Sequence, residues 1–117
     1  MIYYAKDEIK GVRQKAQGGE GEIHSLHSFV QDRRPENSCF RMVGRMTLPP
    51  GSSIGFHIHA EDEEIYLITG GGGIYTDNDR REYPVAPGDL TLTRRGEGHG
   101  LFNNGEEPLT FVAVIAA

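Results

Sequence analysis

Glycine and proline recur at short intervals along this chain and divide it into segments that are short for helices. The sixteen glycines and six prolines cluster at sites such as 49–51, 70–73 and 87–88. Between these sites, apolar residues recur at every second position, which is the period of a half-buried strand. In residues 39–48 and 109–115 the alternating apolar residues are Phe40, Met42, Met46 and Leu48, then Leu109, Phe111, Ala113 and Ile115. Many short strands joined by turns predict an all-β sandwich or barrel.

Length and charge narrow the class of protein further. The chain has 117 residues, enough for one domain, and its formal net charge of −5 argues against nucleic acid or an anionic membrane as a partner. No segment approaches the roughly 20 apolar residues that span a bilayer. The first residues also lack the pattern of a signal peptide. Because the single cysteine, Cys39, cannot form an internal disulfide, we expect a cytoplasmic protein.

The histidines carry the most distinctive chemistry in the sequence. Strand geometry places His57 and His59 on one face, about 6.6 Å apart along the strand. Glu64 follows after a turn, where a neighbouring strand can bring it to the same cluster, and His99 lies at the start of a later strand. Three imidazoles and one carboxylate suit a divalent transition metal (Mn, Fe, Co, Ni or Zn) and not Ca or Mg. The pattern therefore predicts a metal site built from these four residues.

These residues resemble the two sequence motifs of the cupins. The first motif is a glycine, five residues, His-x-His, three or four residues, a glutamate, six residues and a glycine. It is matched by Gly51, His57, His59, Glu64 and Gly71. The second motif is a glycine, five residues, Pro-x-Gly, two residues, a histidine, three residues and an asparagine. It is matched by Gly88, Gly96, His99 and Asn103, with Arg94 at the position of the proline.

The resemblance implies a cupin-type double-stranded β-helix, a jelly-roll-like barrel of two antiparallel sheets. It implies one domain over residues 1–117, with N-terminal strands in 1–47, the first motif in 51–71 and the second in 88–103. Inside the barrel, a metal ion would be bound by His57, His59, Glu64 and His99. Glu63 is an alternative to Glu64 as the carboxylate ligand, but Glu64 keeps the motif spacing to Gly71. Arg94 alters the turn before Gly96 and leaves the ligands unchanged.

Strand alternation then assigns further residues around the site. Glu64, Tyr66 and Ile68 share one face, so Tyr66 and Ile68 are candidate substrate contacts. Tyr66 is also a candidate general acid or hydrogen-bond donor, although packing in the pocket wall explains it equally well. His24 and His27 are three residues apart, a spacing that brings two ligands to one metal only on a helix. We interpret both as solvated strand residues.

The strand that carries His57 and His59 also predicts an oligomer. If the two histidines face the interior, Ile54, Phe56 and Ile58 face outward. Burying each of these side chains fully is worth about 1.5–3 kcal/mol. We therefore expect a homodimer that packs on this face.

The resemblance leaves two classes of function open, because cupins include enzymes as well as binding proteins. The first is a small metal-dependent enzyme of the oxygenase, isomerase or decarboxylase type, acting on a small polar or anionic metabolite. The second is a non-enzymatic module that binds or senses a small molecule or sugar through the same metal. An enzyme needs an acid–base group beside the metal, and strand register offers only Tyr66.

Overall fold

The computed structural model describes residues 1–3, 13–14, 16–30 and 33–117, and these residues form ten β-strands. The first five are β1 (Arg13–Gln14), β2 (Ile23–Phe29), β3 (Phe40–Leu48), β4 (Ser53–Ile58) and β5 (Glu63–Gly70). The others are β6 (Gly73–Thr76), β7 (Glu82–Val85), β8 (Leu90–Thr93), β9 (Gly98–Phe102) and β10 (Leu109–Ala116). Within these described ranges there is no helix long and apolar enough to cross a membrane.

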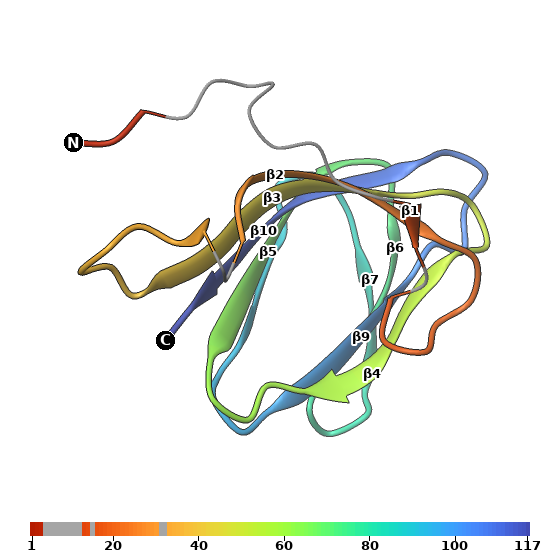
Figure 1. Cartoon of the computed structure of the whole chain (residues 1–117). Coiled ribbons are helices and arrows are strands. Elements are labelled where there is room, and N and C mark those ends of the chain that lie inside the picture. The colour runs from red at the N-terminus through yellow and green to blue at the C-terminus, as the bar shows by residue number, and fades with distance from the viewer. Residues whose placement is uncertain (4–12, 15, 31–32) are drawn as a thin grey trace.

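The strands form two antiparallel sheets that face each other around one core (Figure 1). The larger sheet has the order β1-β2-β3-β10-β5-β8, and the smaller has the order β4-β9-β6-β7. The chain passes from one sheet to the other between β4 and β5, and again between β5 and β6. This arrangement confirms the predicted all-β barrel of two antiparallel sheets.

The alternating apolar residues supply the core, as the sequence pattern predicts. β3 and β10 pair directly, with Leu48 opposite Leu109 and Met46 opposite Phe111. All four of these side chains are buried. Each contributes about 1.5–3 kcal/mol through removal of apolar surface from water. Phe40 differs because it lies beyond a bulge at the end of the β3–β10 pair, where its side chain is exposed.

The prediction that the apolar residues of β4 all face outward is wrong for Ile54. Two β4 residues, 55 and 56, lie opposite one residue of β9, because Ile54 pairs with Leu101 and His57 pairs with His99. This β-bulge changes the alternation, so Ile54 and His57 both point inward. Ile54 is in the core, and Phe56 is half-buried beneath the guanidinium of Arg80. Phe56 lies outside the core cluster and Ile58 is 63% exposed, so these two residues match the expected outer face.

Candidate metal centre

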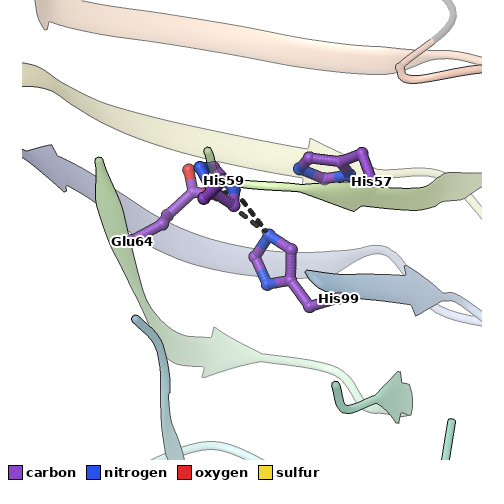
Figure 2. A group of neighbouring side chains, drawn as sticks. All are labelled: His57, His59, Glu64 and His99. Atoms are coloured by element: carbon purple, nitrogen blue, oxygen red, sulfur yellow. Dashed lines mark hydrogen bonds and ion pairs between the residues drawn. The ribbon is translucent and has the colours of Figure 1, made fainter. Parts of the chain in front are cut away.

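Four side chains converge between the two sheets at one end of the barrel. His57 on β4 and His99 on β9 are direct partners in the strand register, and His59 follows the end of β4. Glu64 comes from β5, which belongs to the opposite sheet. The turn after His59 carries the chain across the barrel. One ligand atom from each of the four residues lies within 4.8 Å of the others (Figure 2).

The distances within this cluster fit a metal ion. Nε2 of His59 lies 3.0 Å from Nε2 of His99, and Oε1 of Glu64 lies 3.1 Å from both nitrogens. Neighbouring ligand atoms around a six-coordinate ion with bonds of about 2.1 Å are separated by about 3.0 Å. Three imidazole nitrogens and a carboxylate oxygen are also ligands of divalent transition metals. The cluster could therefore hold such an ion.

Each histidine of the cluster is oriented by a hydrogen bond at its other ring nitrogen. A ring that donates its Nδ1–H outward leaves Nε2 able to bind a metal, and such partners fix the tautomer and the ring orientation. The three acceptors are Gly55 O at 2.8 Å from His57, Asp62 Oδ1 at 2.7 Å from His59, and Thr93 Oγ1 at 2.8 Å from His99. All three imidazoles therefore present the same nitrogen to the centre of the cluster.

Two of these acceptors have partners of their own. The Thr93 hydroxyl lies 2.7 Å from the Tyr75 hydroxyl, which is also 3.2 Å from Nδ1 of His99. Asp62 lies 3.7 Å from the guanidinium of Arg41. No motif spacing indicated Thr93 or Asp62. The only sequence signal was that both residues are polar and lie close to predicted ligands. Asp62 lies between His59 and Glu64 in the chain, and Thr93 pairs with Glu64 on the adjacent strand.

Burial and hydrogen bonding set the protonation of the cluster. Burial alone would raise the pKa of Glu64, but hydrogen bonds from His59 and His99 hold that pKa below its usual value. The hydrogen bond to Glu64 raises the pKa of His59 despite its burial, and Asp62 adds to this effect. Burial lowers the pKa of His57. In the metal-free protein His59 therefore keeps a proton at higher pH than a free imidazole does, while His57 loses its proton at lower pH than a free imidazole does.

The β5 residues lie as the alternation predicts, with Glu64, Tyr66 and Ile68 buried and Glu63 exposed. The cluster therefore contains Glu64 and not Glu63. Tyr66 stacks on the His99 ring at a centroid distance of 4.8 Å, with its hydroxyl 3.5 Å from Nε2. Burial and the nearby Glu64 charge raise the Tyr66 pKa well above its usual value, so the phenol stays protonated. Ile68 lies in the hydrophobic core and does not line the cavity beside the cluster.

Arg94, which replaces the motif proline, closes the turn before β9 by a different interaction. Its backbone N–H and its guanidinium donate hydrogen bonds to the Glu97 carboxylate at 2.9–3.0 Å. The Glu97 N–H donates back to the carbonyl oxygen of Arg94. A charge-assisted, bidentate pair therefore fixes this turn where the motif uses a rigid ring.

A cavity of about 210 Å³ lies against the cluster and contacts both sheets. Its walls include His57, His59, Glu64 and Tyr66, together with apolar residues of β3 and β10. His27 is half-buried and lines this cavity, a position that the interpretation as a solvated strand residue did not include. His24 lies outside this cavity, where its ring contacts Glu22 at 2.9 Å. His24 and His27, at even and odd positions of β2, therefore lie on opposite faces of the strand.

Comparison with known proteins agrees with this fold. Residues 44–115 match the family model for the cupin domain. A Thermotoga maritima protein named oxalate-binding protein is 40% identical over 98 residues, which cover 84% of this chain and 78% of that protein. A Ralstonia gentisate 1,2-dioxygenase is 33% identical over 73 residues, but the match covers only 20% of that enzyme. The crystal structure of a predicted oxalate decarboxylase from Thermotoga maritima has a TM-score of 0.86 and 36% identity over 98% of each chain.

The family match covers more than half of the chain, and its boundaries include both predicted motifs. The relative at 40% identity and the structure with the TM-score of 0.86 extend the similarity to nearly the whole length. These findings confirm the resemblance inferred from the motifs: this chain belongs to the cupin domain family.

Proposed function

We propose that the protein binds a small dicarboxylate, with oxalate as the first candidate, through a divalent metal ion held by His57, His59, Glu64 and His99. The observation that carries this proposal is the convergence of these four ligands against a small cavity. The names of the Thermotoga proteins, an oxalate-binding protein and a predicted oxalate decarboxylase, support the choice of oxalate.

The charge and size of the site both favour a small anion. A divalent ion next to the single Glu64 carboxylate leaves a net positive centre. When bound, the ion supplies open coordination positions for anionic oxygen atoms. The cavity of about 210 Å³ holds the volume of about seven water molecules at roughly 30 Å³ each. It is therefore smaller than the roughly 300–1,000 Å³ of pockets for drug-sized ligands. The candidate metals are Mn, Fe, Co, Ni and Zn, and the binding experiment is made with each of them.

The carboxylate and the phenol in the cavity favour binding over catalysis. Among the described residues that line it, Glu64 is the only carboxylate, and it belongs to the proposed ligand set. Tyr66 keeps its proton because its pKa is raised, so it is a poor general base. Its hydroxyl near His99 nevertheless supports a second candidate, a metal-dependent enzyme of the oxygenase, isomerase or decarboxylase type in which Tyr66 is a hydrogen-bond or proton donor.

Isothermal titration calorimetry of oxalate against metal-loaded and metal-free protein tests the proposal. We expect saturable binding only to the loaded protein. Glu64→Gln should abolish it and Glu63→Gln should leave it unchanged, because only Glu64 lies in the cluster. Equal binding to metal-free protein, or no binding to either form, would contradict the proposal. Conversion of oxalate to formate and carbon dioxide, or uptake of oxygen, would favour the enzyme.

We also propose that the protein forms a homodimer, but on a different surface from the one we expected. Leu67, Leu90 and Leu92 lie side by side on β5 and β8 and are 39–56% exposed on the outside of the larger sheet. A second copy would bury these leucines by packing the same face against itself. Light scattering should show a dimer for the wild type and a monomer for Leu90→Glu. A monomeric wild type at micromolar concentration would contradict this proposal.

The remaining proposals concern the extent of the domain and its location. We propose that residues 1–117 form one cupin domain, since the strands of residues 1–47 complete the larger sheet. A cytoplasmic location is proposed because the chain has one cysteine, Cys39, and that thiol is free. Limited proteolysis would test the first proposal, and cell fractionation would test the second.

A further inference from the structure

His27 lies on β2, which belongs to the other sheet from β4. Figure 1 shows β2 and β4 on opposite sides of the barrel, and the two strands belong to different sheets. Along β2, Ile23, Ser25 and His27 line the cavity beside the metal cluster. His27 therefore belongs to the wall contributed by the larger sheet, whereas His57 and His59 come from the smaller sheet.

The backbone beneath His27 is adapted to this position of the ring. His27 pairs with Gly44 of β3, and a Cβ atom added to Gly44 would lie 2.9 Å from Cδ2 of His27 and 2.8 Å from Cε of Met46. Any larger residue at position 44 would force one of these side chains to move. Glycine thus makes room for the imidazole between the sheet and the cavity.

The ring of His27 has hydrogen-bonding capacity that the described part of the chain does not use. Burial lowers the pKa of His27, so the imidazole is neutral at pH 7 and carries one donor and one acceptor nitrogen. None of the hydrogen bonds or ion pairs among the described residues involves this ring. Neither ring nitrogen of His27 is among the fully buried side-chain atoms that lack a partner, so both are accessible. Because the ring lines the cavity, a polar group on a bound molecule can reach it there.

We propose that His27 is a second anchor for the bound anion, hydrogen-bonding an oxygen at the end of the molecule that faces away from the metal cluster. This inference rests on the function proposed above. It gives a physical reason for a ligand with polar oxygens at both ends, such as a dicarboxylate, and disfavours a monocarboxylate with an apolar tail. A hydrogen bond to a charged oxygen typically changes affinity by about tenfold to a hundredfold.

The test is calorimetry on the full chain loaded with Mn²⁺, using oxalate, malonate and propionate as probes. His27→Leu should weaken binding of oxalate or malonate at least tenfold and leave propionate binding unchanged. His27→Gln, which keeps a donor and an acceptor, should recover part of the affinity. His24→Leu, on the other face of the same strand, is the matched control and should bind as the wild type does. Metal content and circular dichroism should match the wild type in all three variants.

Three outcomes would overturn the proposal, and they are distinguishable. Wild-type affinity for the dicarboxylates in His27→Leu would show that His27 does not contact the ligand. Loss of Mn²⁺ from both His27 variants would show that the residue supports the metal cluster instead. If the loaded wild type binds none of the three acids, the proposed function fails, and the role of His27 that depends on it fails as well.

Discussion

Replacing Thr93 by valine removes the hydroxyl that accepts the Nδ1–H of His99 at 2.8 Å, while keeping the shape of the side chain. Loss of such a partner typically reduces metal affinity about 10–100-fold. The Tyr75 hydroxyl, 3.2 Å from the same nitrogen, remains as a weaker acceptor. We therefore expect Thr93→Val to fall near the lower limit, a loss of about tenfold or 1.4 kcal/mol. The double variant Thr93→Val/Tyr75→Phe should lose about 100-fold.

The assay is a Mn²⁺ or Zn²⁺ titration in competition with a chelator of known affinity. Thr69→Val is the matched control, because it removes a threonine hydroxyl whose exposed hydrogen bond to Thr110 lies away from the cluster. Thr93→Val should also lower the free energy of unfolding by about 1 kcal/mol, since the buried Tyr75 hydroxyl loses the shorter of its two contacts, at 2.7 Å, and keeps the one to His99 at 3.2 Å. Unchanged metal affinity in Thr93→Val and in the double variant would refute the reasoning that these hydroxyls orient His99.

The structure makes two further predictions, one on pH and one on stability. Metal affinity should fall as pH drops through the raised pKa of His59, because the metal must displace that proton, so the midpoint should lie above the roughly 6.5 of free histidine. Asp62→Asn should move this midpoint to lower pH and Glu61→Gln should not, as measured by metal titration from pH 5.5 to 8.5; a midpoint unaffected by Asp62→Asn would contradict the assignment. Leu48→Ala should cost about 2–5 kcal/mol because Leu48 is fully buried. A change in thermal unfolding midpoint of less than a few degrees would show that the core is not packed as described.

The sequence was sufficient to predict the β-class and the four residues that converge as candidate metal ligands, and the reasons are physical. The alternation in residues 109–115 has a single period, so it predicts both the strand and its buried face. The sequence spacings among the four residues match the lengths of the strands and turns that bring them together. These residues are His57, His59, Glu64 and His99. The choice of Glu64 over Glu63 followed from the same alternation, since only one of two adjacent strand residues can face inward.

Other features depended on partners that a single strand does not reveal. The outward prediction for Ile54 failed because the β-bulge at residues 55–56 arises from pairing with β9. The place of His27 in the cavity wall was not predicted because β2 has apolar residues on both faces, with Leu26 exposed and Phe29 buried. The period of the strand therefore did not identify its inner face. Thr93 and Asp62 act through ring nitrogens of the ligands, and no fixed sequence spacing indicates such contacts.

The central claim is that His57, His59, Glu64 and His99 together bind one divalent metal ion. Elemental analysis of the wild type, His99→Ala and His24→Ala, each purified without added metal and then re-equilibrated with equimolar Mn, Fe, Co, Ni and Zn, tests it directly. The account predicts about one metal ion per chain in the wild type and in His24→Ala, and a loss of at least about tenfold in occupancy for His99→Ala. Equal metal content in all three proteins, or loss of metal from His24→Ala alone, would contradict it.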